Sequence, residues 1–338
     1  MAARGVNVTM ADVGDRAGVT ARTVSNVLSN SANVRPETRE RVLRAVDELG
    51  YRMNTSARGL KTGRTGTITL AIPDLGIDYF GELARLVMTE ASRHDWTVVI
   101  QQTAGRRETE IDILSGAARQ HSDGLIFQPH ALGPGDERHL VGNERLVILG
   151  DRIFNGPVDH VGMNNVESAR MATQYLIDRG YTRIAAIGPN PRVNTVSAAS
   201  LRLKGFLDAL TAAGLPTPSE RVVVAEEWHL HDGAAGAAQL LDLPERPDAV
   251  FCFNDTLAIG ALHTIAMRGL RVPEDIAVIG FDNVPAAQYA FPPLTTIDPG
   301  TDRIAKHAVD MLASRVSGSS DPPREILTAS SLVVRRSA

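Results

Sequence analysis

Polar and aromatic side chains follow the predicted strands of this chain directly, where they could bind a small polar ligand. Carboxylate and amide groups pair with neighbouring hydroxyl groups of a ligand, and an aromatic ring stacks on an apolar ligand face. The residues in such positions are Asp74, Tyr79, Phe80, Gln128, His130, Asp151, Arg152, Arg192, Asn254, Asp255, Asp282 and Asn283. This set favours a neutral sugar or polyol over a purine as the ligand.

A second role is open to each of these residues, because short polar side chains also cap helices. A side chain that follows a strand often precedes a helix, where it accepts hydrogen bonds from the free N–H groups of the first turn. Each residue taken alone fits either role equally well. The residue types therefore leave ligand binding and helix capping both open.

Short β-rich runs and amphipathic helical stretches alternate along residues 67–338. The β-rich runs are residues 67–72, 97–101, 124–127, 146–149, 184–187, 249–253 and 277–281. The stretches with helical periodicity are residues 79–94, 165–179, 201–213 and 255–268. This alternation predicts parallel, doubly wound sheets, and the length of the region predicts two lobes. Because such sheets bind ligands at the carboxyl ends of their strands, we expect the site in the cleft between the lobes.

The composition is that of an ordinary globular protein. The chain has 338 residues, of which 43% are hydrophobic and 22% are charged, and its formal net charge is −4. These values exclude a disordered or fibrous chain, and no apolar run has the length of a membrane helix. The N-terminal residues lack the apolar core of a signal peptide, and the single cysteine, Cys252, cannot form an internal disulfide. We therefore expect a cytoplasmic protein with no membrane partner.

Charge is distributed unevenly along the chain. Residues 1–65 carry 11 Lys and Arg against 6 Asp and Glu, a net charge of +5, whereas the other residues carry 24 against 33, a net charge of −9. A basic segment on an acidic body is typical of a nucleic-acid-binding head. An arginine-rich, solvated helical surface would give the same charge balance. The pattern of residue types along this segment must therefore distinguish the two interpretations.

The pattern of the N-terminal segment predicts two short helices and a tight turn. Thr9 and Asp12 have the spacing of a capping box at the start of the first helix, and Gly18 is a stop signal at its end. Thr20 then caps a second helix over residues 21–28. Its expected inward side chains are Val24, Val27 and Leu28, and its polar side carries Arg22, Thr23, Ser25 and Asn26.

A third helix is predicted between Pro36 and Gly50, with Val42, Leu43, Val46 and Leu49 facing inward. Three short helices with a glycine turn make a helix-turn-helix domain. Small hydrogen-bonding side chains on the second helix suit the reading of base edges in the DNA major groove.

With these motifs the chain resembles the lactose- and galactose-repressor family of bacterial transcription regulators. The motifs that carry the resemblance are residues 8–13 (VTMADV), 17–20 (AGVT), 23–28 (TVSNVL), 39–42 (RERV) and 49–51 (LGY). The resemblance implies a sequence-specific DNA-binding regulator, with repression as the expected effect. The expected DNA-binding residues are Thr9, Thr20, Ala21, Arg22, Thr23, Ser25, Asn26, Asn33, Ala57, Leu60 and Lys61.

Two positions in this head depart from the family pattern. Asn26 stands where the family usually has an arginine that contacts a guanine, and Arg35 replaces a common capping serine. Asparagine can pair with adenine through two hydrogen bonds, so we expect a shifted base preference.

Residues 54–63 (NTSARGLKTG) resemble the hinge of the family. In the family this segment folds into a short helix on specific DNA and presses a leucine into the minor groove. Leu60 matches that leucine, which would partly unstack a base step and kink the duplex.

The resemblance implies a particular division of the chain. The fold expected is an all-α helix-turn-helix head and an α/β body of two doubly wound parallel-sheet lobes, similar to a periplasmic sugar-binding protein. Residues 1–53 would be the head, 54–65 the hinge and linker, and 66–338 the effector-binding and dimerisation domain. The first lobe would take in about 67–162 and 295–323, and the second about 163–294 and 324–338.

The resemblance also assigns contacts to a small-molecule effector. It implies Asp151, Arg202, Trp228, Asn254 and Asp282, within motifs at residues 150–152 (GDR), 197–206, 253–255 (FND) and 280–282 (GFD). Arg202 and Trp228 are hard to explain as helix caps. Together with Tyr79, Phe80 and Gln128 from the strand ends, they complete the expected effector site.

An enzyme is the alternative, because doubly wound folds support many reactions. The phosphate-binding and nucleophile motifs of such enzymes are missing, and His229 and His231 lack convincing metal partners. We therefore expect no catalytic residue, no cofactor and no metal. The alternative kept open is a sugar-binding or sugar-processing enzyme that carries a DNA-binding head.

The expected partners are double-stranded palindromic operator DNA, a small-molecule effector and a second copy of the chain. A homodimer places two heads on successive half-sites, because two-fold protein symmetry matches two-fold DNA symmetry. Opening or closing of the cleft would change the spacing of the hinges and so couple the effector to DNA.

Overall fold

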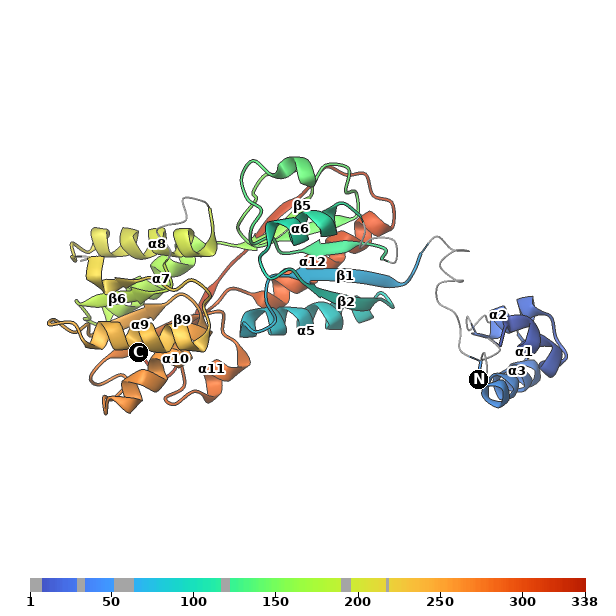
Figure 1. Ribbon diagram of the computed structural model, residues 1–338, viewed down its shortest axis with the longest axis horizontal. Helices are drawn as coiled ribbons and strands as arrows, with labels where there is room; N and C mark the ends of the chain where they lie inside the picture. Colours follow the sequence, from blue (N-terminus) through green and yellow to red (C-terminus); the bar gives the residue numbers. More distant parts are fainter. Residues whose placement is uncertain (1–7, 29–33, 52–63, 117–121, 190–195, 217–218) are drawn as a thin grey trace, which may run out of the picture. The chain divides into compact units, whose positions relative to one another are not determined.

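The structure of the protein is a computed structural model (Figure 1). It describes residues 8–28, 34–51, 64–116, 122–189, 196–216 and 219–338. The chain divides into two compact units, Met1–Thr65 and Gly66–Ala338. Among the described residues, no helix combines the length and the apolar character needed to cross a membrane.

Three helices form the described part of the first unit: α1 (Met10–Ala17), α2 (Ala21–Leu28) and α3 (Pro36–Leu49). The predicted capping box starts α1, since Thr9 N–H donates to Asp12 Oδ2 at 2.7 Å and Asp12 N–H donates to Thr9 Oγ1 at 3.3 Å. Gly18 ends α1 in the left-handed conformation, with φ 65°. The predicted helix-turn-helix arrangement is confirmed.

A small apolar core holds these helices together. Its buried side chains are Val13, Ala17, Val24, Val27, Val42, Ala45 and Tyr51. The prediction that Leu43 faces inward is wrong, because its side chain is 44% exposed. The inward stripe of α3 runs through positions 42, 45, 46 and 49, which is the spacing of one helix face, and residue 43 lies beside that face.

The second unit contains two six-stranded sheets, each with helices on both faces (Figure 1). The first sheet has the order β11-β5-β4-β3-β1-β2, and all its pairs are parallel. Its strands are β1 (Thr67–Ile72), β2 (Thr97–Gln102), β3 (Leu125–Phe127), β4 (Leu146–Leu149), β5 (Asp159–Met163) and β11 (Glu325–Thr328). Its helices are α5 (Asp78–Ser92), α6 (Arg107–Leu114) and α12 (Thr301–Val316), and a short turn, η2 (Glu137–His139), precedes β4.

The second sheet has the order β12-β10-β9-β8-β6-β7 and is parallel except for the edge strand β12. Its strands are β6 (Ile184–Ile187), β7 (Val222–Val223), β8 (Ala249–Cys252), β9 (Ala277–Phe281), β10 (Thr295–Asp298) and β12 (Ser331–Val333). Its helices are α7 (Asn165–Asp178), α8 (Ala198–Ala212), η3 (Ser219–Arg221), α9 (Leu230–Leu241), α10 (Asp255–Met267) and α11 (Pro285–Tyr289). Helix α7 packs against α8, and α9 packs against α10.

The chain crosses between the two lobes three times, and two of the expected boundaries need correction. Residues 295–298 were expected in the first lobe, but β10 pairs with β9 in the second sheet. Residues 325–328 were expected in the second lobe, but β11 pairs with β5 in the first sheet. The crossings therefore follow β5, β10 and β11.

Candidate functional site

The exposed side of α2 carries the polar side chains that were expected to contact DNA. Arg22 and Asn26 are exposed, and Thr23 and Ser25 are half-buried. Val24 lies on the opposite side and is fully buried in the core of the head. The major groove of DNA admits one α-helix, so a helix with a polar outer face on a small rigid core has the form required for base reading.

Thr9 and Thr20 have local hydrogen bonds that begin their helices. Thr9 Oγ1 donates to Asp12 Oδ2 at 2.7 Å, and Thr23 N–H donates to Thr20 Oγ1 at 3.3 Å. Ala21, the first residue of α2, is exposed. The other expected DNA-binding residues, Asn33, Ala57, Leu60 and Lys61, lie outside the described residues, as does Arg192.

A cavity of about 480 Å³ lies between the two lobes of the body. The structure brings all eight expected effector residues to its wall: Tyr79, Phe80, Gln128, Asp151, Arg202, Trp228, Asn254 and Asp282. The side chains come from the starts of helices and from the residues after β3, β4, β8 and β9, which place them at the carboxyl ends of the strands. The cavity lies where ligands of doubly wound sheets bind.

Arg202 is the buried centre of the cavity wall. Its guanidinium lies over the ring of Phe281, with Cζ 3.5 Å from the ring centroid, and its Nη2 lies 3.7 Å from Asp282 Oδ1. Nε donates to Asn165 Oδ1 at 2.8 Å, and Nη1 donates to the carbonyl oxygen of Phe253. A buried guanidinium needs such partners, because an unpaired charge away from water is costly.

Asn165 links the two lobes beneath the cavity. Its Nδ2 donates to Asp151 Oδ2 at 2.9 Å, and its Oδ1 accepts the bond from Arg202. Asp151 follows β4 of the first sheet, whereas Arg202 lies in α8 of the second lobe. A chain of polar contacts thus runs from Asp151 through Asn165 and Arg202 to Asp282.

Burial changes the acidity of the carboxyl groups in this wall. It raises the pKa of Asp282 to about 7, and the charge of Arg202 opposes the shift while Asp78 adds to it. Burial also raises the pKa of Asp151, against the charges of Arg202 and Arg152. A group that titrates near neutral pH can accept or donate a hydrogen bond to a ligand.

Asn254 shows that capping and cavity lining can coincide. Its Oδ1 accepts a hydrogen bond from Leu257 N–H at 2.7 Å, which caps α10, and its Nδ2 donates to the carbonyl oxygen of Trp228 at 3.2 Å. The capping role is therefore confirmed for Asn254. Asp151 and Asp282 are held instead by Asn165 and Arg202, so capping does not explain their positions.

Trp228 has a backbone conformation that its surroundings must hold. Its φ is 62°, which is uncommon for a bulky residue. Its ring Nε1 donates to the carbonyl oxygen of Gly188 at 2.9 Å, and Arg202 lies beside its ring, with Cζ 5.4 Å from the centroid. The indole is thus fixed at the side of the cavity.

Two features of the site escaped the sequence patterns. Asn165 follows a capping asparagine at the start of α7, so its position predicted only a helix terminus. His229 also lines the cavity, where its Nε2 lies 3.1 Å from Asp74 Oδ2. No signal in the sequence pairs Asp74 with His229, because 155 positions separate them.

The described residues include no group of three or more His, Cys, Asp or Glu side chains that could hold a metal ion. Cys252 is buried in β8, and burial raises the pKa of its thiol. A neutral buried thiol is a poor nucleophile, so the thiol of Cys252 serves packing.

Comparisons with known proteins cover nearly the whole chain. Residues 9–54 match the family described as bacterial regulatory proteins, lacI family, and residues 173–338 match a periplasmic binding protein-like domain. A relative from Vibrio atlanticus (strain LGP32), named HTH-type transcriptional repressor PurR, is 33% identical over 91% of this chain and 92% of its own length. The HTH-type transcriptional regulator GalS of Salmonella typhimurium is 33% identical over 93% of this chain and 92% of its own.

Several solved structures of transcription regulators are similar to this chain. A LacI-family transcriptional regulator from Sanguibacter keddieii is 40% identical, with a TM-score of 0.74 over 81% of this chain and 99% of the other. The Lac repressor dimer bound to operator and the anti-inducer ONPF is 27% identical, with a TM-score of 0.80 over 98% of this chain and 99% of the other. A complex of the transcriptional regulator CelR with cellobiose is 29% identical, with a TM-score of 0.70 over 98% and 100%.

The helix-turn-helix head, the two-lobed body and the relatives lead to the same conclusion. The names of these relatives are those of transcriptional repressors and transcriptional regulators. The chain belongs to the lacI family of bacterial regulatory proteins, DNA-binding transcriptional repressors with a ligand-binding domain.

Proposed function

We propose that the protein represses transcription from a palindromic operator and that an uncharged sugar or polyol in the cavity controls its affinity for that operator. The observation that carries this proposal is the composition of the cavity wall. A polyhydroxyl ligand needs many hydrogen-bond acceptors and an apolar surface for its ring face. The wall offers both, with carboxylates and amides beside Tyr79, Phe80 and Trp228.

The charge of the wall supports an uncharged ligand. Five carboxylates and two guanidinium groups line the cavity: Asp74, Asp151, Glu226, Glu227, Asp282, Arg152 and Arg202. The two guanidinium groups already have partners, since Arg202 binds Asn165 and Phe253, and Arg152 Nη1 donates to the carbonyl oxygen of Val196 at 2.9 Å. A phosphate or carboxylate on the ligand would therefore meet repulsion from the described part of the wall.

One buried acceptor in the wall fits a hydroxyl donor. Gln128 Oε1 is buried and has no hydrogen-bond partner within the described part of the chain. Its amide packs closely on Gly150, where an added Cβ would lie 2.1 Å from Gln128 Nε2. The backbone of Gly150 thus fixes the amide, and a ligand hydroxyl would satisfy the remaining oxygen.

A purine is the second candidate ligand, because several relatives carry the name PurR. The cavity volume of about 480 Å³ favours the sugar, since it lies in the range of sites that enclose drug-sized molecules and a purine base is smaller. The CelR structure, solved with cellobiose, is an example of a related protein with a disaccharide. We therefore propose a disaccharide or larger glycoside as the first ligand to test.

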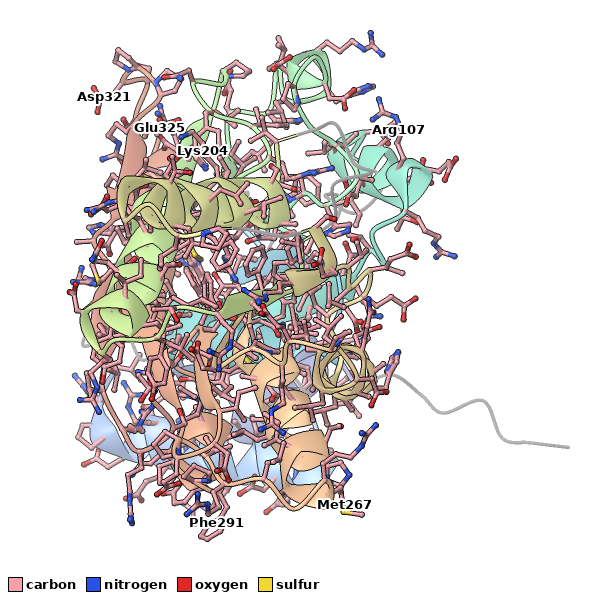
Figure 2. All side chains as sticks on the ribbon, turned by 90° about the vertical axis from the view of Figure 1, so that its left-hand side faces the viewer. Arg107, Lys204, Met267, Phe291, Asp321 and Glu325 are labelled. Atoms are coloured by element: carbon pink, nitrogen blue, oxygen red, sulfur yellow. The ribbon has the colours of Figure 1, made fainter. Side chains whose placement is uncertain are left out.

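We further propose that the protein acts as a homodimer, which places two heads on the two halves of the operator. Phe291 and Tyr289 are 93% and 83% exposed. Figure 2 shows Phe291 and Met267 projecting from the lower edge of the second lobe. Exposed large apolar side chains on one face are typical of a subunit contact. Phe291→Asp is expected to shift the sedimentation coefficient from that of a dimer towards that of a monomer.

The function is tested by selecting operator sequences from randomised DNA with the full-length protein and then titrating ligands against the selected site. Disaccharides, polyols, purine bases and sugar phosphates form the panel. The expected result is a palindromic site whose affinity changes with an uncharged sugar. A response to a purine or a sugar phosphate alone would contradict the ligand proposal, and turnover of any sugar would favour the enzyme alternative.

A further inference from the structure

A side-chain contact joins the two lobes at the edge of the cavity between them. Asp74 follows β1 of the first lobe, and His229 precedes α9 of the second. His229 Nε2 lies 3.1 Å from Asp74 Oδ2, and the two side chains are 28% and 32% exposed. Both residues also line the cavity, so the contact lies between the cavity and solvent.

The loop of the first lobe holds the Asp74 carboxylate in position. Gly76 N–H donates to Asp74 Oδ1 at 2.8 Å, which leaves Oδ2 facing His229. Leu75 N–H donates to Gln102 Oε1 at 3.2 Å and ties the loop to the end of β2. An added Cβ at position 76 would lie 3.3 Å from His229 Cε1, so the glycine allows the imidazole to approach this closely.

Hydrogen bonds in the second lobe position the backbone at His229. His229 N–H donates to Asp232 Oδ2 at 3.0 Å at the start of α9. The preceding residue, Trp228, has the left-handed backbone described above, which its hydrogen bonds to Gly188 and Asn254 maintain. A left-handed bulky residue persists only where its surroundings hold it, and this one turns the chain so that His229 faces the first lobe.

Other polar contacts also join the lobes around the cavity. Asn165 binds Asp151 beneath it, and Arg152 Nη1 binds the carbonyl oxygen of Val196 beside it. The half-exposed pair of Asp74 and His229 is one of the contacts that must separate when a ligand passes between the lobes at this point.

We propose that Asp74 and His229 form a latch that favours the closed arrangement of the lobes and slows the passage of ligand through the mouth. The latch rests on the proposed function in one respect, that the cavity holds an effector. For a partly exposed pair of polar side chains, loss of either partner is expected to lower the closed-to-open ratio by about two- to fivefold.

The test needs no ligand, because Trp228 directly precedes His229 in the chain. The accessibility of Trp228 to a quencher is expected to rise when the latch opens. The chain has two tryptophans, Trp96 and Trp228. In full-length protein with Trp96→Phe, acrylamide quenching of fluorescence then measures the accessibility of Trp228 alone. Asp74→Asn and His229→Gln are the variants, and far-ultraviolet circular dichroism checks their folding. His231 is unsuitable as a control, because its ring stacks on that of His229 with centroids 5.8 Å apart. His263→Gln, at an exposed position of α10, is therefore the control.

The latch predicts increased quenching of Trp228 in Asp74→Asn and in His229→Gln, no further increase in the double variant, and no change in His263→Gln. Asp74 belongs to the other lobe, so its effect on Trp228 cannot come from a change next to the tryptophan in the chain. Quenching in Asp74→Asn equal to that of the parent protein would overturn the latch. That result would leave the ligand proposal standing, since the latter is tested by the titration of operator binding.

Discussion

The guanidinium of Arg202 lies over the ring of Phe281, with Cζ 3.5 Å from the ring centroid, and its Nη2 lies 3.7 Å from Oδ1 of Asp282, the next residue in the chain. The cavity wall thus places a buried cation between an aromatic face and an acid. Planar guanidinium groups suit this arrangement better than an ammonium group does, because they stack on rings and bind several partners in one plane.

Arg202→Gln should lower the free energy of unfolding by about 3 kcal/mol or more, because it removes one partner of a buried charged network. Lys204→Gln on the same helix is the control. Lys204 is 61% exposed and pairs with Asp208 four residues later, and Figure 2 labels it on the surface. An exposed pair of this kind contributes about 0.5 kcal/mol or less. Urea denaturation measures both, and similar losses in the two variants would contradict the network.

Asp282→Asn should change the pH dependence of stability. The pKa of Asp282 in the folded protein, about 7, lies above the ordinary value of 3.8. The folded state therefore holds this proton where the unfolded state has lost it, and the free energy of unfolding falls as the pH rises from about 4 to 7.

Asparagine mimics the protonated acid and removes this contribution. The stability of Asp282→Asn relative to the parent protein should rise by roughly 1 to 3 kcal/mol between pH 5 and pH 8. Denaturation curves at the two pH values measure the change. A difference between the two proteins that is independent of pH would show that Asp282 does not titrate in this range.

Asn165→Ala should cost about 2 kcal/mol or more, because the buried carboxylate of Asp151 and the buried guanidinium of Arg202 each lose a hydrogen bond. The neighbouring Asn164→Ala is the matched control. Asn164 accepts a bond from Glu167 N–H at 3.3 Å as the cap of α7, and loss of such a cap costs about 1 kcal/mol. Equal stability losses at the two positions would argue that Asn165 is only part of the helix terminus.

Asn26→Ala should weaken binding to the selected operator by about 1 to 3 kcal/mol and relax base preference at one position of each half-site. Stability of the head should remain unchanged, since Asn26 is exposed. Val24→Ala should do the reverse, lowering head stability by about 2 kcal/mol through loss of a fully buried side chain. Operator affinity and thermal unfolding of both variants separate base reading from folding. An unchanged base preference in Asn26→Ala would remove Asn26 from the set of base contacts.

Local patterns predicted the strands that lie at the centre of the body. The runs 184–187 and 277–281 match β6 and β9 in full, because short apolar runs between polar turns form buried strands. The candidate cavity residues were found for the same reason, since polar side chains at the ends of buried strands gather at one edge of the sheet.

Relationships across the chain were not predictable from local patterns. The pairing of β10 and β11 with opposite sheets depends on where the chain crosses between lobes, and 170 positions separate Asn155 N–H from its acceptor Glu325. The bond of Asn165 to Asp151 and the contact of Asp74 with His229 likewise join segments from different lobes. Their residue types fit helix ends or loops equally well, so only the fold shows what they contact.

The central claim is that ligand in the cavity controls operator binding, and fluorescence anisotropy of the selected operator duplex tests it directly. The affinity of the full-length parent protein is measured with and without the sugar found in the panel, beside Asp282→Ala. The account predicts a change of about fivefold or more in the parent protein, and an unchanged ligand-free affinity with no response in Asp282→Ala. Operator affinity that no ligand of the panel alters, or an equal response in Asp282→Ala, would contradict it.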